Sequence, residues 1–390
     1  MNQLLFEGRS LVGIVSSVIR QDDRHVSYSR LDWERMYRLS DYHKVANIVY
    51  LGLLGYRETV PDKWRDRFFK RYQESLQFGE NCEESLKEVL TWLNMREISC
   101  TVLTSETVRG FYRLPETADI SSVQIFLDEE KYYLAKGYLI DLGYETDETY
   151  KDFGERLKKV SAVSITLYRK LPFRTSKFYK NMVKILETAR IKEPYEFIWE
   201  LPSDSEFLYR MAGAAYRYTT DELTLREVLE LVLCHRAWKE EIDDESLWKR
   251  LEEFKVDGLA EKILEIAYMW FGEKTDTFLE TKADDMSVYD SLEERLLTRG
   301  LVNHEKDEQA LKLQSLIEKE LEKEKKAEGK DIRKERFGKY FSEQKKKLRW
   351  IFPDRHYMAS IYPVVEKFPI LLPVFWIIRG ARLLWRSIVH

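Results

Sequence analysis

The sequence predicts an α+β protein that is mainly helical and contains one small mixed β-sheet. Apolar residues recur at helical spacing through most of the chain, whereas residues 98–103, 122–127 and 162–168 alternate apolar and polar side chains as strands do. The chain has 390 residues, of which 44% are hydrophobic and 13% aromatic, so it is long enough to bury a sizeable core.

Residues 1–95 are predicted to form an N-terminal helical block. Apolar residues keep helical spacing there, and turn signals are few. Pro61 and Asp62 precede an amphipathic run over residues 64–93. A helix is expected to begin at this point, because an acidic residue is favourable near the positive end of a helix.

Residues 96–172 are predicted to form an α/β module in the order strand, loop, strand, helix, strand. Its helix spans residues 131–142 and ends at Gly143, a residue that commonly terminates helices. Helical spacing then dominates again, so residues 173–283 are predicted to be a helical domain. The chain is expected to continue with a charged helical arm over residues 284–349 and an aromatic and basic tail over residues 350–390.

Composition excludes several classes of protein. The formal net charge is only -4 with 34% charged residues of both signs, so no overall field indicates a nucleic-acid partner. No signal peptide is recognised, and the apolar run at residues 369–378 is about half of the roughly 20 residues that a spanning helix needs. A cytoplasmic location is therefore expected. Residues 368–386 join apolar and aromatic groups to arginines, which suits either peripheral contact with a membrane or packing onto the helical domain.

A series of short motifs runs through the chain in a recognisable order: His43-Lys44-Val45, residues 102–106, Tyr112, residues 125–127, Gly143-Tyr144, residues 163–168, Leu225-Arg226 followed by Glu230, and Trp270-Phe271-Gly272. In this order they resemble the bacterial uncharacterised nucleotidyltransferases of the polymerase-beta-like nucleotidyltransferase superfamily. The resemblance implies a Lys-Gly turn after the first strand, an Asp-x-Asp pair on the second and a third acid on the third. In active members such acids hold Mg²⁺ for transfer from an NTP.

The departures from that pattern fall on the catalytic positions. Ser105 and Glu106 stand where Lys-Gly is expected. Ser122 and Gln124 stand at the paired aspartates, and Thr166 stands near the third acid. Hydroxyl and amide oxygens are dipoles rather than charges, so useful Mg²⁺ affinity is expected to be lost. The sequence thus predicts a degenerate, or pseudo-, nucleotidyltransferase with a binding or regulatory role toward an unknown small molecule or protein.

The sequence also suggests two alternative functions. The first is an active enzyme that uses Mg²⁺ and NTP with the displaced acids Glu106 and Asp119. The second is a peripheral membrane or assembly factor, recruited through residues 368–386 and linked to surface-polysaccharide machinery, which the family resemblance also suggests.

Arg109 and Arg226 are the candidate ligand-binding residues. The guanidinium of Arg226 is placed to reach a phosphate across the cleft. An ion pair with Glu230, four residues further along a helix, explains it equally well. Arg109 suits contact with an anionic ligand or simple solvation at the surface.

Overall fold

The computed structural model describes residues 3–21, 30–56, 59–104, 106–118, 122–273, 286–298 and 308–326, together with Pro373, Val374 and Trp376. The chain divides into two units, Met1–Glu318 and Lys319–His390. All helices and strands discussed below belong to the first unit, and the second is described mainly by a helical stretch up to residue 326. Apart from the three residues named, the predicted aromatic and basic tail lies outside the described residues.

The chain begins with helices, as predicted from the sequence. These are α1 (Gln3–Arg20), α2 (Trp33–Tyr42), α3 (Ala46–Leu53), the 3-10 turn η2 (Leu54–Tyr56) and the 34-residue α4 (Asp62–Met95). The residue Pro61 caps α4, so this helix begins where the sequence places its start.

The strands form one seven-stranded mixed sheet in the order β3-β4-β5-β2-β1-β7-β6. Their bounds are β1 (Cys100–Val102), β2 (Val123–Phe126), β3 (Glu145–Tyr150), β4 (Gly154–Lys158), β5 (Ile165–Tyr168), β6 (Arg190–Ile191) and β7 (Ile198–Glu200). The three predicted strands are β1, β2 and β5 at the centre, where β2 runs antiparallel to β1 and parallel to β5.

The sequence did not predict the four outer strands. The strand β3 is exposed along almost its whole length, and β6 has only two residues, so neither carries an apolar alternation. Moreover, β6 and β7 come from the segment after residue 172, which was predicted to be helical. Strand β7 nevertheless pairs directly with β1. The sheet therefore draws on residues beyond the predicted α/β module.

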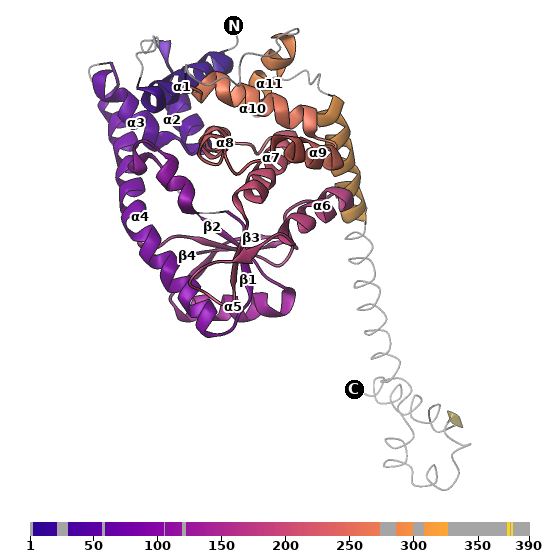
Figure 1. Cartoon of the computed structure of the whole chain (residues 1–390). Coiled ribbons are helices and arrows are strands. Elements are labelled where there is room, and N and C mark those ends of the chain that lie inside the picture. Colours follow the sequence, from indigo (N-terminus) through magenta and orange to yellow (C-terminus); the bar gives the residue numbers. More distant parts are fainter. Residues whose placement is uncertain are drawn as a thin grey trace, which may run out of the picture. The chain divides into compact units, whose positions relative to one another are not determined.

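Along the central strands, successive side chains point to opposite faces of the sheet. The side chains of Val102, Ile125 and Leu167 are buried in one cluster with residues of α4 and of α5 (Glu129–Asp141). These two helices cover that face (Figure 1). Residues at the intervening positions, including Gln124 and Thr166, point to the opposite face. That face carries the polar side chains discussed below.

Helices dominate the rest of the first unit, as predicted. They are α6 (Ser176–Leu186), α7 (Ser203–Thr219), α8 (Leu225–Ala237), α9 (Asp244–Phe254), α10 (Asp257–Phe271) and α11 (Met286–Thr298). Although α11 falls in the predicted charged arm, Leu292, Leu296 and Leu297 on it are buried. Its Glu293 accepts a hydrogen bond of 2.9 Å from Arg9 of α1.

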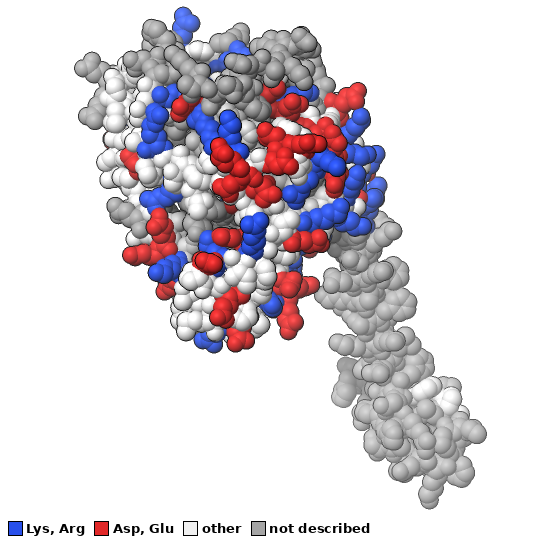
Figure 2. Space-filling view, viewed as in Figure 1, with Lys and Arg blue, Asp and Glu red and all other residues white. Residues whose placement is uncertain are grey.

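Two further expectations concern the charge of the surface and the presence of a membrane-spanning helix. On the face shown in Figure 2, basic and acidic side chains are interspersed, in keeping with the small net charge. Within the described part of the chain, every helix is too short or too polar to cross a membrane.

Two glycines test the placement of β4 beside β5. A Cβ on Gly154 would lie 1.9 Å from the carbonyl oxygen of Leu167, whereas a Cβ on Gly137 of α5 would meet no atom within 4 Å. Gly154→Ala is therefore expected to lower the free energy of unfolding by about 2–3 kcal/mol. The matched change Gly137→Ala should raise it by about 0.5–1 kcal/mol, because alanine favours a helix. Urea denaturation measures both, and similar effects of the two variants would contradict the pairing.

Candidate functional site

Three neutral side chains meet on the face of the sheet that is turned away from α4 and α5. Gln124 of β2 is the register partner of Thr166 in β5, and Ser122 precedes Gln124 by two residues. The hydroxyl oxygens of Ser122 and Thr166 are hydrogen-bonded at 2.5 Å, and Thr166 is only 3% exposed. The positions that the resemblance assigns to metal-binding acids thus lie side by side.

This floor does not fit the divalent cation that nucleotidyl transfer uses. The two hydroxyls are engaged with each other, and neither they nor the Gln124 amide carries the negative charge that Mg²⁺ ligation favours. Among the residues described, no three His, Cys, Asp or Glu side chains are grouped to hold a metal. Ser105, Asp119 and the side chain of Glu106 lie outside the described residues, so a site built from displaced acids stays a prediction.

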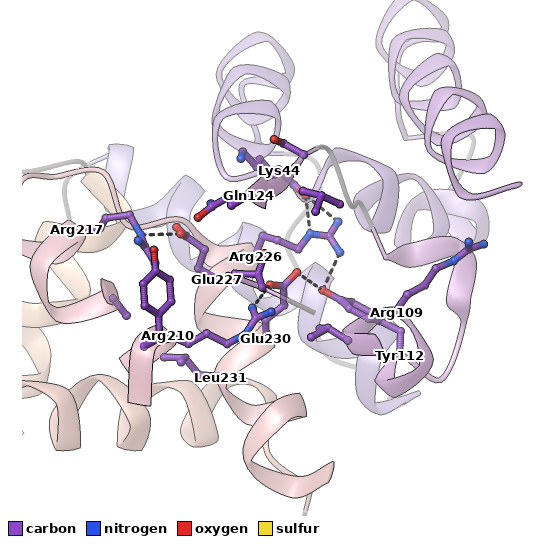
Figure 3. Close-up of a pocket in the computed structure, with 16 residues that line it drawn as sticks. Lys44, Arg109, Tyr112, Gln124, Arg210, Arg217, Arg226, Glu227, Glu230 and Leu231 are labelled. Atoms are coloured by element: carbon purple, nitrogen blue, oxygen red, sulfur yellow. Dashed lines mark hydrogen bonds and ion pairs between the residues drawn. The ribbon is translucent and has the colours of Figure 1, made fainter. Parts of the chain in front are cut away.

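A pocket lies on this floor, between the sheet and helices α7 and α8 (Figure 3). The residues Ser122, Val123 and Gln124 supply part of its lining. Its charged lining consists of five cationic side chains and two carboxylates, which are Lys44, Arg109, Arg210, Arg217, Arg226, Glu227 and Glu230. Cations therefore outnumber anions around the pocket.

One of the two carboxylates is engaged with a buried arginine. Glu230 accepts hydrogen bonds from Arg210 and from the Tyr112 hydroxyl, each at 3.2 Å. Arg210 also donates to Glu206 at 2.7 and 2.9 Å. Burial opposes the charge of this arginine, but the neighbouring carboxylates hold the pKa of Arg210 above its ordinary value. Glu230 is therefore engaged with protein groups and shares Arg210 with Glu206.

The other carboxylate closes the start of α8. The Thr224 backbone N–H donates to the Glu227 carboxylate at 3.0 Å, and the Glu227 backbone N–H donates to the Thr224 hydroxyl oxygen at 3.3 Å, which makes a capping box. The Thr224 hydroxyl also donates to the same carboxylate oxygen at 2.9 Å. The second carboxylate oxygen of Glu227 lies 2.7 Å from Nε of Arg217. Burial disfavours ionisation here, yet Arg217, Lys44 and the Thr224 hydrogen bonds hold the pKa of Glu227 below its ordinary value. It stays a carboxylate at neutral pH.

Arg226, a predicted ligand-binding residue, directs all five of its N–H groups at protein oxygens. Nε and Nη2 donate to the Lys44 carbonyl at 2.9 and 2.7 Å, and Nη2 also donates to Asn47 at 2.7 Å. Nη1 donates to the Thr117 carbonyl at 2.6 Å and to the Tyr112 hydroxyl at 3.1 Å. In this conformation the guanidinium has no N–H left for a phosphate. Arg226 instead fixes the wall of the pocket.

The predicted contact between Arg226 and Glu230 runs through a third residue. The hydroxyl of Tyr112 accepts from Arg226 and donates to Glu230. Burial raises the pKa of Tyr112, so its hydroxyl remains a donor.

Arg109, the other predicted ligand-binding residue, is turned away from the centre of the pocket (Figure 3). Its guanidinium donates to the carbonyl oxygen of Gly79 in α4 and lies 3.9 Å from the Glu83 carboxylate. The residue contributes to the lining, but its charged end serves the packing of η3 (Glu106–Phe111) against α4.

Two family motifs far apart in sequence meet beside the pocket. The backbone N–H of Leu225 donates to Nδ1 of His43 at 3.2 Å, and the N–H of Arg226 donates to the His43 carbonyl at 3.3 Å. The turn after α2 therefore docks on the start of α8. This contact places the neighbouring Lys44 at the pocket.

Lys44 and Arg217 are site residues whose role the sequence did not predict. Lys44 is an exposed residue, and Arg217 lies in the last turn of α7, where a basic side chain is common for a helix whatever its function. Lys44 appeared only as part of the His-Lys-Val motif. Their convergence depends on the contacts between α2, α7 and α8, which leave no local pattern in the sequence.

The comparison with protein families agrees with the motifs. A family model described as uncharacterised nucleotidyltransferase matches residues 29–272, a range that includes every residue lining the pocket. This match confirms the predicted family resemblance. The searches of curated proteins and of solved structures gave no match.

Removing the Arg226 guanidinium should destabilise the protein, because this group holds the wall of the pocket together. Arg226→Met leaves several buried oxygens without their donor, so the free energy of unfolding is expected to fall by about 3 kcal/mol or more. Arg217→Met makes the same chemical change in the same pocket but breaks only one charge pair, and about 1 kcal/mol or less is expected. Denaturant unfolding of the two variants, followed by circular dichroism, measures the difference. Equal losses would show that Arg226 does not join the segments as described.

Proposed function

We propose that this chain, which belongs to the uncharacterised nucleotidyltransferase family, uses the family cleft to bind a ligand and does not transfer nucleotides. The observation that carries the proposal is the hydroxyl pair of Ser122 and Thr166, with Gln124 beside it, at the positions of the expected carboxylates. Such a chain is a degenerate nucleotidyltransferase with a binding or regulatory role.

The proposal follows from the charge that nucleotidyl transfer requires. Divalent cations must bridge the phosphates and stabilise the charge that develops in the transition state. A floor of hydroxyls and an amide supplies dipoles but no net charge to hold those cations. The two carboxylates that line the pocket, Glu227 and Glu230, are already paired with Arg217 and Arg210. They are poor substitutes for the missing acids.

A second candidate is active transfer through Glu106 and Asp119. Thr104 and Ser122 line the pocket, and these acids stand two residues after the first and three residues before the second. Their closeness in sequence to the lining is the observation that favours this candidate. It requires at least one of the two carboxylates to enter the pocket.

The wild-type protein is expected to give no nucleotidyl transfer. Each of the four NTPs, labelled on the α-phosphate, is incubated with the full chain and Mg²⁺ or Mn²⁺, and pyrophosphate release and labelled product are measured. Neither should exceed a blank without protein. Transfer that disappears in both Glu106→Ala and Asp119→Ala would establish the second candidate and sink the first.

Restoring the acids should create a metal site. S122D/Q124D/T166D places three carboxylates where the hydroxyls and the amide converge, and burying them together without a cation is unfavourable. Its melting temperature in EDTA should therefore fall below that of the wild type and recover by several degrees with Mn²⁺. The matched triple S122N/Q124N/T166N has similar volume but no charge, so it should show no response to the metal. An equal rise in the wild type would mean that a metal site already exists.

A further inference from the structure

Two cationic side chains of the pocket keep open hydrogen-bond donors. The other three direct their guanidinium groups at protein acceptors, as described above. For Lys44, no hydrogen bond or ion pair of the ammonium occurs within the described part of the chain. Arg217 is paired by charge with Glu227 through its buried Nε, and its Nη1 and Nη2 groups make no hydrogen bond to any residue that the structure describes. These two cations are available to a ligand.

Lys44 and Arg217 approach the pocket from different parts of the fold. Lys44 lies in the turn after α2, whereas Arg217 belongs to α7. Figure 3 shows Glu227 between them, and both cations act electrostatically on this carboxylate. The space around Glu227 is therefore reached by positive charge from both sides, a setting that attracts a second anion such as phosphate.

The neutral floor favours the same kind of ligand. Gln124 lines the pocket between these cations, and its amide makes no hydrogen bond to any residue that the structure describes. An aspartate at this position would repel a phosphate unless a metal ion stood between them. The amide N–H groups of Gln124 donate to a phosphate oxygen directly. The substitution that removes a metal ligand therefore supplies a phosphate ligand.

We infer that the cleft binds a phosphate-bearing anion directly on Lys44, Arg217 and Gln124, with no divalent cation between protein and phosphate. This inference rests on the proposed function, because it requires a cleft that binds without catalysing transfer. The arginine supplies a planar pair of donors, the lysine a point charge and the glutamine a neutral donor. Glu227 lies beside the phosphate position as an internal anion, so it limits affinity and favours ligands with several negative charges.

Titration calorimetry of the full chain in EDTA tests the inference. The probes are the four NTPs, inorganic pyrophosphate and the corresponding nucleosides. The phosphate compounds should bind and the nucleosides should not, and excess Mg²⁺ should leave the affinity unchanged or weaken it because the cation shields the phosphates. Preference for one NTP over pyrophosphate would assign a nucleotide ligand, and equal binding would assign the phosphate group alone. Binding that requires Mg²⁺ would overturn the inference.

Single variants locate the bound phosphate. Lys44→Met, Arg217→Met and the near-isosteric Gln124→Glu should each weaken binding in EDTA at least tenfold, and Glu227→Gln should strengthen it several-fold. The matched control is Arg38→Met on α2, which removes the same charge from an exposed ion pair with Glu34 and should change affinity less than twofold. Near-UV circular dichroism confirms that each variant is folded. If the pocket variants behave like Arg38→Met, the inference is wrong.

The proposed function and the inferred phosphate ligand are contradicted by different results. Nucleotidyl transfer by the wild type would remove the proposed function, whatever the titrations in EDTA show. Absence of both transfer and phosphate binding would remove only the inference about the ligand. Metal-free binding without transfer supports both.

Discussion

The pocket depends on the buried guanidinium of Arg226. Its five N–H groups join the start of α8 to the turn after α2, to α3 and to the loops between β1 and β2, and its acceptors include carbonyls 109 and 182 residues away along the chain. Buried carbonyl oxygens without donors are costly, so each segment is held where the guanidinium can reach it. The Lys44 backbone is fixed by the same bonds. Its side chain therefore stands at the pocket as a consequence of packing.

A second constraint sorts the remaining charges. A buried ion must be paired, and Arg210 meets this requirement with Glu206 and Glu230, while Glu227 meets it with Arg217 and the start of α8. The carboxylates near the cleft are thus used to keep helices in place. The groups left for a ligand are the cations of Lys44 and Arg217 and the neutral amide of Gln124. This distribution suits an anion better than a hydrated divalent cation.

The three central strands, and the face of the sheet on which the polar floor of the pocket lies, could be predicted from the sequence. Strand alternation puts Ser122 and Gln124 on one face, and the predicted order of elements allows the strand with Thr166 to pair alongside, so their convergence follows from local rules. The outer strands were missed because β3 is exposed and β6 is too short to show a pattern. The acceptors of Arg226 could not be predicted for a different reason. Helical spacing pointed to Glu230 four residues away, whereas its actual acceptors are distant in sequence.

The two constraints connect ligand binding to the fold. Lys44 is held by the turn that docks on α8 through His43, and Arg217 belongs to α7, so a phosphate that contacts both bridges α7 to the turn that Arg226 already joins to α8. A ligand that binds only the joined state stabilises it by mass action. An occupied cleft should therefore hold the N-terminal helices on the helical domain more firmly than an empty one. A protein with such a cleft can report the concentration of an anion through its own stability, which requires no catalysis.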